Sequence, residues 1–405
     1  MKVLHVIFSV SSLRGGPSQA VLNLVKNLIS CGVDAEIATT NEAGSTLLDV
    51  PLNQKIEYEG VPVWFFEPFS PPNQGVSLTL DKGFIFSTAL TQWLWQNIRN
   101  YDILDNHYLF SYPSTCAGAI ARWQNVPYTV RTTGQLAPWA LAQSRRKKQL
   151  YSFLIERHNL NRAAAIHCAS SGEAEDARNF GVKAPIITLP LGVQQIPDQP
   201  GAKQQLRQNY QIPATTPIVL FLARIHPVKR PELLLKALAQ LAQNYDFHLI
   251  LAGTGETSYL DQLNNLVSLL GLKSRISMPG FVTGEAKALL LQGSDIFVLP
   301  SVIESFGISI AEAMAAGLPV IVTEDVKISS EILAAQAGLV VPGEVEALAD
   351  ALANLLPNPN LRHQMGENGK QLATHRYSWE AIASSLASVY TAIVQQQPLP
   401  QFPET

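Results

Sequence analysis

Short runs of hydrophobic and β-branched residues alternate along this chain with longer stretches whose apolar positions recur at helical spacing. This alternation is typical of parallel strands joined by helices. In the first half, the predicted strands are KVLHVIFSV, DAEIATT, VPVWFF, DILDNHY, YTVRTT and AAIHCAS. In the second half, they are IVLFLAR, FHLILAG, RISMPGF, DIFVLP, PVIVTE and GLVVP. The pattern therefore predicts an α/β protein with two open, doubly wound parallel sheets.

A segment rich in Pro and Gln, residues 194–217, separates the two series of strands and predicts a hinge near residues 193–200. One long helix is predicted within WALAQSRRKKQLYSFLIERHNLNRA. We therefore expect an N-terminal Rossmann-like domain at 1–195, a second at 196–377, a helix at 378–396 and a disordered tail at 397–405.

The composition narrows the class of function. The chain has 405 residues, of which 47% are hydrophobic, so two globular domains are expected. Its net charge of −3 argues against a nucleic-acid partner, which would need a basic surplus. Cys31, Cys116 and Cys168 lie too far apart in the sequence for a redox pair or a zinc site. No apolar run reaches the roughly 18 residues of a spanning helix, so we expect a cytoplasmic protein.

Ligands of open parallel sheets bind at the carboxyl ends of the strands, so the loops that follow the predicted strands are the candidate sites. The first is SSLRGGPSQA, in which Gly15 and Gly16 allow close backbone approach before a helix N-terminus that could hold an anion. It is not G-x-G-x-x-G, and no acidic residue closes the second strand, which disfavours a dinucleotide site. A tight turn alone would explain this loop equally well.

The second loop, LARIHPVKRPELLLKAL, carries two cations. Arg224 and Lys229 follow a buried strand and precede a helix that begins near Pro231. Cations are unfavourable beside a helix N-terminus, and a bound diphosphate would remove that conflict. A surface charge pair would explain either residue alone, whereas both together favour a phosphate site.

The third candidate comprises two strand ends. LAGTGETSYLDQL places Gly253 and Gly255 after a strand, and PGFV places Phe281 and Val282 after the next strand. Backbone groups there could contact a nucleobase. Plain strand-to-helix turns are the alternative for both.

The fourth candidate is DIFVLPSVIESFGISIAEAMAAG, predicted as strand, loop and helix with Ser305 as N-cap. Glu304 lies in the loop and Glu312 in the helix, so the two carboxylates could contact opposite ends of one ligand. The backbone N–H groups between them could hold phosphates, and they belong to Phe306, Gly307 and Ile308. The alternative is that Glu304 only complements the helix dipole and Glu312 is solvated.

Together these loops resemble the retaining GT-B glycosyltransferases of family 4, whose marks are a glycine loop, an R-x4-K pair and an E-x7-E motif. DNHYLFSYPS, GQLAPWALAQSRRKKQLY, PLGV, GLVVP and MGENGKQLATHRYSWEAIA also resemble segments of bacterial polysaccharide and lipid-carrier glycosyltransferases, so that the match covers nearly the whole chain. The resemblance implies the GT-B fold, with two Rossmann-like domains facing a central cleft, and a final helix that crosses back to the first domain. The first domain would bind the acceptor and the second the nucleotide sugar.

The resemblance also implies residue roles. Gly16, Arg224, Lys229 and the backbone near Gly307 would hold the diphosphate of a UDP- or GDP-sugar. Glu304 would contact the transferred sugar and Glu312 the ribose, while the Gly253 loop with Phe281 and Val282 would border the nucleoside.

The predicted chemistry is transfer of a hexosyl group without a metal or other cofactor. The chain has no D-x-D motif, and two cations with a helix N-terminus could stabilise the leaving diphosphate instead. The leaving phosphate could then take the proton of the attacking hydroxyl. Relatives commonly have His where this chain has Thr133, which cannot titrate, so His107 is the other candidate on the acceptor side.

The acceptor is expected to be a saccharide or a lipid-linked sugar, in exopolysaccharide or cell-envelope glycan synthesis. The run RRKK, residues 145–148, could attract the anionic inner face of the plasma membrane, or it could be a solvated helix face. Two other functions stay open. One is a nucleotide-sugar epimerase of GT-B fold, and the other is a catalytically silent nucleotide-binding partner of a polysaccharide assembly.

Overall fold

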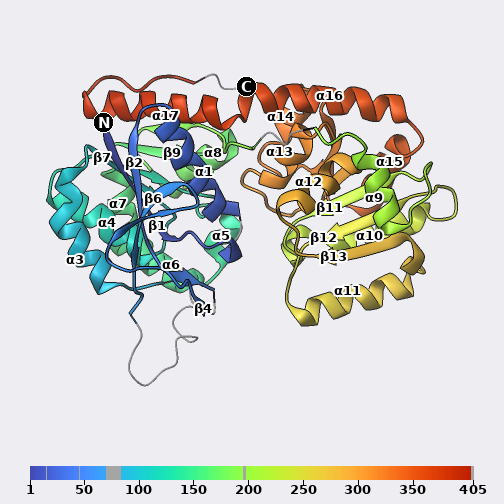
Figure 1. Cartoon of the computed structure of the whole chain (residues 1–405), viewed down its shortest axis with the longest axis horizontal. Helices are drawn as coiled ribbons and strands as arrows, with labels where there is room; N and C mark the ends of the chain where they lie inside the picture. Colours follow the sequence, from blue (N-terminus) through green and yellow to red (C-terminus); the bar gives the residue numbers. More distant parts are fainter. Residues whose placement is uncertain (15, 45, 70–83, 195–197, 403–405) are drawn as a thin grey trace. The chain divides into compact units, whose positions relative to one another are not determined.

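The computed structural model describes residues 1–14, 16–44, 46–69, 84–194 and 198–402 (Figure 1). The chain forms two compact units. Unit 1 consists of Met1–Gly192 together with Trp379–Thr405, and unit 2 is Val193–Ser378. Each unit is a Rossmann-like α/β unit with one large, mostly parallel sheet between helices, and the predicted fold class is therefore confirmed for each unit.

The sheet of unit 1 has eight strands in the order β10-β9-β8-β7-β1-β2-β6-β5. All neighbours are parallel except β5 and β6. The strands are β1 (Lys2–Ser9), β2 (Asp34–Thr40), β5 (Lys55–Tyr58), β6 (Val61–Phe66), β7 (Ile103–His107), β8 (Tyr128–Arg131), β9 (Ala165–Cys168) and β10 (Ile186–Thr188). A separate hairpin pairs β3 (Glu42–Ala43) with β4 (Thr46–Leu47).

Helices cover both faces of this sheet because its central strands are buried along their whole length. One face packs a hydrophobic core around Leu4 and Val6 against α3 (Thr88–Asn97), α4 (Tyr112–Trp123) and α8 (Ser171–Phe180). On the other face, α1 (Gly16–Ser30) packs against α17 (Trp379–Val394). His5 points to this second face, since it alternates with Leu4 and Val6 along β1 and its ring contacts Tyr390 of α17.

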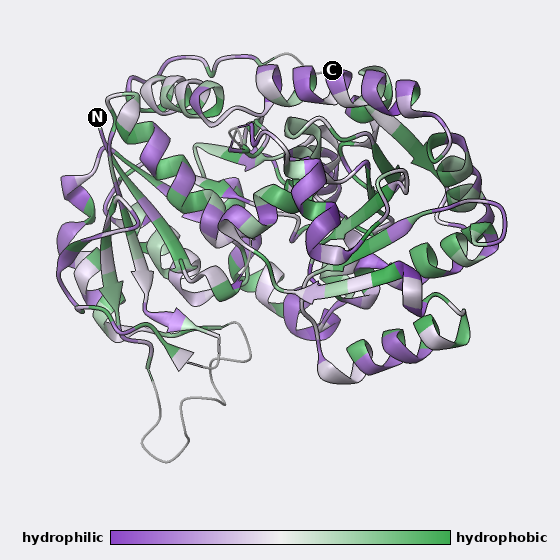
Figure 2. Ribbon diagram, turned by 45° about the vertical axis from the view of Figure 1, so that its right-hand side comes forward, coloured by the Kyte–Doolittle hydropathy of each residue, from purple (hydrophilic) through white to green (hydrophobic). Residues whose placement is uncertain are grey.

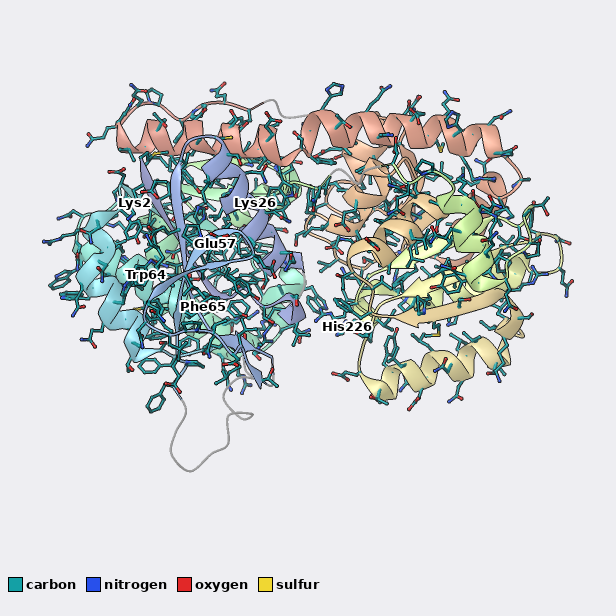
Figure 3. All side chains as sticks on the ribbon, in the orientation of Figure 1. Lys2, Lys26, Glu57, Trp64, Phe65 and His226 are labelled. Carbon is teal, nitrogen blue, oxygen red and sulfur yellow. The ribbon has the colours of Figure 1, made fainter. Side chains whose placement is uncertain are left out.

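A buried carboxylate links neighbouring strands of the sheet in unit 1. Glu36 of β2 accepts hydrogen bonds from Trp64 Nε1 at 2.9 Å and from Tyr101 Oη at 2.7 Å, and Lys2 Nζ lies 3.2 Å away. Lys2 of β1 and Trp64 of β6 are labelled in Figure 3. Burial alone would raise the pKa of Glu36, but these hydrogen bonds outweigh it and lower the pKa to about 2.

The sheet of unit 2 has six parallel strands in the order β13-β12-β11-β14-β15-β16. Figure 2 shows hydrophobic residues, in green, along strands of this sheet; β11 and β14 at its centre are buried along their whole length, whereas the edge strand β13 is half-buried. The strands are β11 (Ile218–Leu222), β12 (His248–Ala252), β13 (Ile276–Gly280), β14 (Ile296–Leu299), β15 (Val320–Thr323) and β16 (Gly338–Val341). The helices are α9 (Ala202–Tyr210), α10 (Pro231–Leu241), α11 (Thr257–Leu269), α12 (Gly284–Gly293), α13 (Ile308–Ala315), α14 (Ser329–Ala334), α15 (Val345–Leu355) and α16 (Pro359–Arg376).

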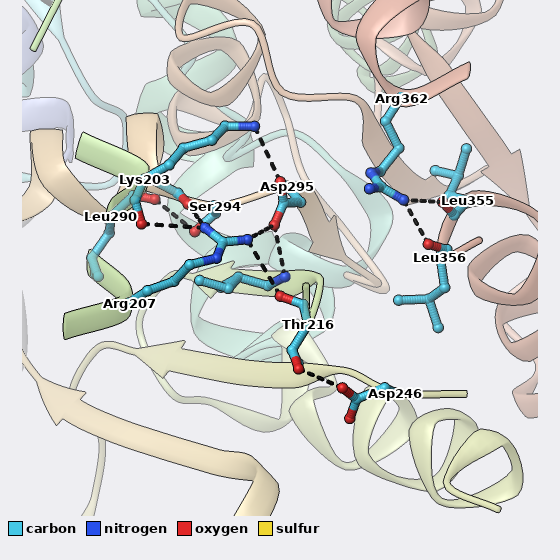
Figure 4. A network of polar contacts seen from close by, with 12 residues as sticks. Lys203, Arg207, Thr216, Asp246, Leu290, Ser294, Asp295, Leu355, Leu356 and Arg362 are labelled. Atoms are coloured by element: carbon cyan, nitrogen blue, oxygen red, sulfur yellow. Dashed lines mark hydrogen bonds and ion pairs between the residues drawn. The ribbon is translucent and has the colours of Figure 1, made fainter. Parts of the chain in front are cut away.

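A polar network fixes the amino end of this sheet (Figure 4). Asp295, just before β14, accepts hydrogen bonds from Arg207 Nη2 at 2.8 Å and from Lys203 Nζ at 3.1 Å, both on α9, and from the Ile218 N–H at 3.0 Å. Because these groups lie at the amino ends of β11 and β14, the network anchors α9 and leaves the carboxyl ends of the strands for other contacts.

The structure differs from the predicted elements in three places. β5 and the β3–β4 hairpin were not predicted. The predicted long helix is interrupted near Ser144, which has a left-handed φ of 54°. The resulting pieces are α5 (Pro138–Ala142), α6 (Arg145–Tyr151), a π-helical turn (Ser152–Glu156) and α7 (Arg157–Asn161).

The third difference is the tail. Of the tail predicted to be disordered, 397–405, residues 397–402 run back along α17 (Figure 1), with Leu399, Pro400 and Phe402 half-buried, and residues 403–405 lie outside the described part of the chain. A shallow hollow between tail and helix is lined by Cys31, Ser388, Thr391 and Pro398, among others. Among the described residues, no helix is both long and apolar enough to cross a bilayer.

Candidate functional site

The strand order of unit 2 reverses between β11 and β14, which are neighbours although two strands separate them in the sequence. In open α/β sheets, the carboxyl ends of the strands at such a switch point form the usual ligand crevice. The loop after β11 carries Arg224 and Lys229, and the loop after β14 carries Glu304. The switch point therefore brings together residues that the sequence motifs had singled out separately.

Lys229 and Glu304 form an ion pair across this switch point. Lys229 ends a 3-10 turn, Pro227–Lys229, and its ammonium contacts Glu304 Oε2. Only 16% of the Lys229 side chain and 20% of the Glu304 side chain are exposed, so both groups are partly desolvated. Each is thus oriented by the other, and a bound anion or sugar hydroxyl would exchange with an existing contact.

Main-chain and side-chain hydrogen bonds hold the two loops in register. The Val302 N–H donates to the Val228 carbonyl at 2.9 Å, which ties the β14 loop to the β11 loop. Arg230 Nε donates to the Pro300 carbonyl at 3.0 Å. The Lys327 N–H donates to the Glu304 carbonyl at 2.9 Å, so the main chain of Glu304 is fixed from a third loop. The site residues therefore stand on a connected framework.

Arg224 differs from Lys229 because its side chain is exposed at the end of β11. The next residue, Ile225, donates its N–H to the Thr254 carbonyl at 2.8 Å, which joins this loop to the one after β12. His226, labelled in Figure 3, accepts a hydrogen bond from the Val228 N–H at 3.2 Å and closes the turn that leads to Lys229. The two cations are thus held on one short loop, with Arg224 facing solvent.

Gly253 has a structural reason to be glycine. A Cβ at this position would lie 1.8 Å from the Ala223 carbonyl oxygen, and its φ is 142°. A Cβ at Gly255 would likewise lie 2.0 Å from the Ile225 carbonyl oxygen. Close contact between the β11 and β12 loops therefore accounts for both glycines. After β13, Phe281 is 58% exposed and Val282 is half-buried, so an exposed ring flanks these loops.

The N-terminus of α13 lies at the same end of the sheet. Gly307, with φ of 81°, is its N-cap residue, and Ile308 is the first helical residue. The prediction that Ser305 caps this helix is wrong, because the helix starts two residues later than the capping geometry of Ser305 requires. Gly307 has no side chain that could cap the first turn of α13. Such a helix end offers N–H groups and a positive dipole end to an anion.

Phe306 has a packing role beside this helix end. Its side chain is 2% exposed, and its ring meets that of Tyr377 edge to face at 5.2 Å between centroids. Only its backbone could contact a ligand. Glu312 lies one turn into α13 and forms an ion pair with Lys287 of α12, 2.6 Å from Nζ to Oε1. The structure thus places Glu304 before the helix end and Glu312 beyond it, as separate groups with separate lysine partners.

In unit 1, the strand order reverses between β1 and β7. Gly15 lies outside the described residues, and Gly16 begins α1 directly after it. A small hollow at this end of the sheet collects His107 of β7 and Thr133 after β8. It is lined by Ile7, Pro17, Ala20, Val21, Leu24, His107, Tyr108, Arg131, Thr133, Leu191 and Trp379. The structure therefore brings the two acceptor-side candidates together beside the first turns of α1.

Thr133 sits in a strained backbone conformation with φ of 48°, which is unfavourable for a β-branched residue. Its neighbours hold it there. Thr132 Oγ1 donates to Glu173 Oε1 at 2.7 Å, and the Gly134 N–H donates to the same oxygen. Such strain in a position fixed from both sides is common at functional sites.

His107 belongs to a buried polar cluster. His107 Nε2 lies 3.0 Å from His5 Nδ1, and both rings lie near Asp105, with Oδ2 at 3.5 Å from His5 Nδ1 and 3.7 Å from His107 Nε2. Arg131 Nε and Tyr390 Oη donate to that same Asp105 oxygen at 2.9 Å and 2.6 Å. The cluster therefore links three adjacent strands to α17.

Burial controls the protonation of this cluster. It lowers the pKa of His5 to about 4 and holds the pKa of His107 well below its ordinary value. Burial alone would raise the pKa of Asp105, but the Arg131 guanidinium and the neighbouring groups outweigh it and hold that pKa well below its usual range. His107 is thus neutral near pH 7. His5, Asp105 and His107 could together also offer metal ligands, but Asp105 Oδ2 already accepts two hydrogen bonds, one of them from a guanidinium cation.

Sequence reasoning missed the partners of the predicted residues. His107 is buried beside Asp105, which accepts hydrogen bonds from Arg131 and Tyr390. Lys287 pairs with Glu312. The available signal was a charged or imidazole side chain in the middle of a strand predicted to be buried, as in KVLHVIFSV and DILDNHY. No comparable signal identifies Lys287, a partly buried residue on α12.

Comparisons with known proteins agree with this geometry. The model of the family "Glycosyl transferases group 1" matches residues 202–372, and that of the "Glycosyl transferase 4-like domain" matches residues 15–192. A D-inositol 3-phosphate glycosyltransferase of Xylanimonas cellulosilytica is 26% identical over 400 residues, covering 95% of this chain and 93% of that protein. The alpha-D-kanosaminyltransferase of Streptomyces kanamyceticus is 28% identical over 271 residues, 65% of each protein.

Solved structures share the fold. The sucrose-phosphate synthase of Thermosynechococcus elongatus aligns with a TM-score of 0.79 at 21% identity, covering 98% of this chain and 100% of that one. The Anabaena protein HepE, solved in complex with UDP and glucose, aligns with a TM-score of 0.77 at 20% identity, covering 97% of this chain and 100% of that one. At this identity the likeness concerns the fold.

Proposed function

The chain belongs to the group 1 glycosyltransferases of family 4, which have the GT-B fold, and from this we propose that it is a retaining hexosyltransferase that uses a nucleotide-diphosphate sugar. The acceptor is a saccharide or a lipid-linked sugar, in the synthesis of an exopolysaccharide or a cell-envelope glycan. Unit 2 binds the donor and unit 1 the acceptor. The observation that carries this proposal is the pairing of Lys229 with Glu304 beside the N-terminus of α13, at the switch point of the sheet in unit 2.

The proposed donor site matches the charge of a nucleotide diphosphate. Lys229 and Arg224 supply two cations on one loop, and the first turn of α13 supplies backbone N–H groups. When the bond between sugar C1 and the phosphate oxygen breaks, the negative charge on the diphosphate grows. Fixed cations and a helix end stabilise that charge without a metal ion. The two cations and the N–H groups of the α13 first turn are therefore what supports metal-independent transfer.

The reaction needs one proton acceptor and one leaving group. The acceptor hydroxyl oxygen attacks C1 while the C1–phosphate bond breaks, and the hydroxyl proton passes to an oxygen of the leaving phosphate. Attack and departure on the same face would retain the configuration at C1. Because the phosphate takes the proton, no titrating side chain is needed at Thr133, and the low pKa of the buried His107 is no obstacle.

The two glutamates then have separate roles. Glu304 accepts hydrogen bonds from hydroxyls of the transferred sugar, and Glu312 accepts them from the ribose. Each carboxylate already faces a lysine, Lys229 and Lys287 respectively. Donor binding therefore moves Lys229 from Glu304 toward the phosphates, which leaves the Glu304 carboxylate for the sugar. This exchange conserves charge pairing, since one ion pair replaces another.

A thermal-shift screen of UDP, GDP and ADP, each with its glucose conjugate, tests the donor site. UDP-glucose is the first donor to try, because the HepE structure was solved with UDP and glucose. We expect at least one nucleotide to raise Tm. If none does, the donor site is refuted.

Glu304→Gln tests the catalytic proposal once a donor is known. It should abolish sugar transfer and leave nucleotide affinity within about threefold, since the carboxylate is assigned to the sugar. Lys229→Ala should lower both sugar transfer and nucleotide affinity. Glu346→Gln, on α15, is a matched control that should change neither. Wild-type turnover in Glu304→Gln would contradict the assignment, and nucleotide binding by a wild-type protein that transfers no sugar to any acceptor would favour a silent binding partner.

A further inference from the structure

Three large apolar side chains point into solvent from one stretch of unit 1. Leu150 is 62% exposed, Phe153 76% and Leu154 62%. They lie at the end of α6 and in the π-helical turn that continues it, with the spacing i, i+3, i+4 that places side chains on one helix face. Single exposed apolar residues are ordinary, but a contiguous group of this kind marks an interaction surface.

Cationic side chains lie beside this group. Arg145, Arg146 and Lys147 at the start of α6 are all exposed. Residues 138–162 contain a single acidic residue, Glu156, which is buried with 1% of its surface exposed. The segment is therefore strongly cationic on the outside, in a chain whose net charge is −3. The basic apolar face is defined here as Arg145, Arg146, Lys147, Leu150, Phe153 and Leu154.

The inner side of the same helix is already satisfied by unit 1. Lys148 Nζ donates to the Ala140 carbonyl at 2.6 Å and lies 5.0 Å from the centre of the Phe110 ring. Tyr151 shares a hydrogen bond with Thr115, and Glu156 Oε1 accepts from the Phe110 N–H at 3.2 Å. The helix is thus anchored through one face, and its outward apolar residues are not needed to hold it in place.

The helix packs on loops that carry the acceptor-side residues. Phe110 belongs to the loop that follows His107 of β7. The Leu109 N–H of this loop donates to Gln135 Oε1 at 3.0 Å, and Gln135 comes two residues after Thr133. The basic apolar face is therefore joined by short, direct contacts to the carboxyl-end loops of unit 1.

We propose that the basic apolar face binds the surface of an anionic lipid bilayer. Leu150, Phe153 and Leu154 insert among the acyl chains, while the guanidinium and ammonium groups of Arg145, Arg146 and Lys147 contact lipid phosphates. Interfacial binding of this kind needs an apolar face of limited depth together with flanking cations, which is the combination found here. It deepens the proposed function by giving a lipid-linked acceptor a place on unit 1, although binding to lipid is measurable without sugar transfer.

Sedimentation of the full-length protein with lipid vesicles tests the proposal. One vesicle preparation is pure phosphatidylcholine, and the other contains equal parts of phosphatidylcholine and phosphatidylglycerol. The wild-type protein should sediment with the anionic vesicles and stay in solution with the neutral ones, and added salt should weaken the binding. Absence of sedimentation, or equal sedimentation with both, would overturn the proposal.

Two triple variants separate the contributions. Arg145→Ala/Arg146→Ala/Lys147→Ala should lower the partition coefficient about a hundredfold, since each cation near an anionic surface contributes about fivefold. Leu150→Ser/Phe153→Ser/Leu154→Ser should lower it about tenfold or more. The charge-matched control is Lys26→Ala/Arg99→Ala/Lys183→Ala, whose residues are also exposed in unit 1. If the control loses as much binding as the first variant, the effect is one of net charge and the face is not the site.

Sedimentation velocity without lipid tests the other occupant of such a surface, a second copy of this chain. A dimer that the serine variant dissociates, in a protein that ignores vesicles, would reassign the face to self-association. The test of lipid binding can also be distinguished from the test of the proposed donor site. Both variants should keep the wild-type thermal shift with nucleotide, so loss of lipid binding alone tests the membrane surface and loss of the shift alone tests the donor site.

Discussion

Tyr390 of α17 donates its phenolic hydrogen to Asp105 Oδ2 of β7 at 2.6 Å, across 285 positions of sequence. Both side chains are fully or almost fully buried, and the same oxygen accepts Arg131 Nε. A buried carboxylate needs its hydrogen bonds, because losing one leaves charge without compensation. The contact therefore couples the last helix of the chain to the centre of the sheet in unit 1.

Tyr390→Phe should destabilise unit 1 by about 2 kcal/mol, because it removes one hydrogen bond to a buried, charged group without creating a large cavity. For a unit of this size, Tm should fall by about 5 °C in a thermal melt followed by circular dichroism. Tyr259→Phe, which removes a hydrogen bond to the half-buried Glu232 in unit 2, is the control and should cost less. Equal losses in both variants would mean that the contact with Asp105 has no special weight.

Acid should destabilise the protein through its buried histidines. Burial lowers the pKa of His5 to about 4 and of His167 to about 3, and it holds that of His107 well below 6.5. The unfolded chain therefore binds more protons than the folded one below pH 6.5, and stability that is present above pH 6.5 is lost as the pH falls. Between pH 7.5 and 5.5, the three histidines together should remove about 4 kcal/mol from the free energy of unfolding.

Urea unfolding at the two pH values measures this loss. His167→Gln keeps a donor for the Leu189 carbonyl, which His167 Nε2 contacts at 2.7 Å, and removes one titrating ring. Its pH dependence should be smaller than that of the wild type by about 1 kcal/mol over the same interval. A free energy of unfolding that does not change between pH 7.5 and 5.5 would contradict the buried, neutral histidines.

Glu156 should act in the opposite direction. Burial raises its pKa to about 7, although hydrogen bonds from the Phe110 N–H and Thr115 lower it in part. The folded protein then binds one more proton than the unfolded chain between about pH 4.5 and 7. The contribution of Glu156 to the free energy of unfolding therefore falls as the pH rises through that window. When the pH falls from 7.5 to 5.5, protonation of Glu156 should raise the free energy of unfolding by about 2 kcal/mol. Set against the loss from the three histidines, this leaves a net loss of about 2 kcal/mol in the wild type.

Glu156→Gln removes that compensation and keeps the side chain's shape. The variant should lose about 4 kcal/mol between pH 7.5 and 5.5, twice the wild-type loss, in the same urea experiment. Glu175→Gln, an exposed position on α8, is the control and should follow the wild type. If Glu156→Gln also follows the wild type, Glu156 titrates near its ordinary pKa and is not protonated in the folded protein.

Gly253→Ala should disrupt the loops at the proposed donor site, because a Cβ there would lie 1.8 Å from the Ala223 carbonyl oxygen. The matched control is Gly271→Ala, since Gly271 also has a positive φ, 69°, but nothing within 4 Å of a Cβ. The control should cost about 1 kcal/mol from the backbone alone, and Gly253→Ala should cost clearly more and weaken nucleotide binding. The measurements are the free energy of unfolding and the nucleotide Kd, and equal effects on both would refute the steric reason.

Most of the fold was predictable because buried parallel strands are apolar along their whole length. KVLHVIFSV and IVLFLAR are short and mostly apolar, which indicates buried strands, and the structure confirms both as strands. β5 was not predicted because two of its four residues, KIEY, are charged. It is an edge strand that pairs with β6, so it does not have the continuous apolar run of a central strand. The predicted long helix fails at Ser144 because apolar spacing does not report a single left-handed residue.

The loops of the candidate site were predictable for a different reason. The carboxyl ends of parallel strands share one edge, so motifs at strand ends must lie near one another, as Lys229 and Glu304 do. To predict contacts between neighbouring strands, one must know the order of the strands in the sheet, which the sequence does not show. His5 and Asp105 are register partners although 100 positions separate them, and so the buried cluster behind His107 could not be derived from spacing.

Unit 1 is built from two separated pieces of chain, and this affects the order in which the protein can be made. Unit 2 lies entirely between these pieces, so a ribosome finishes it before it synthesises α17. Until then, Asp105 lacks the Tyr390 hydroxyl and one face of the first sheet lacks its final helix. The first unit to be started is consequently the last to be completed, and during synthesis its exposed face is the part of the chain that most needs protection from aggregation.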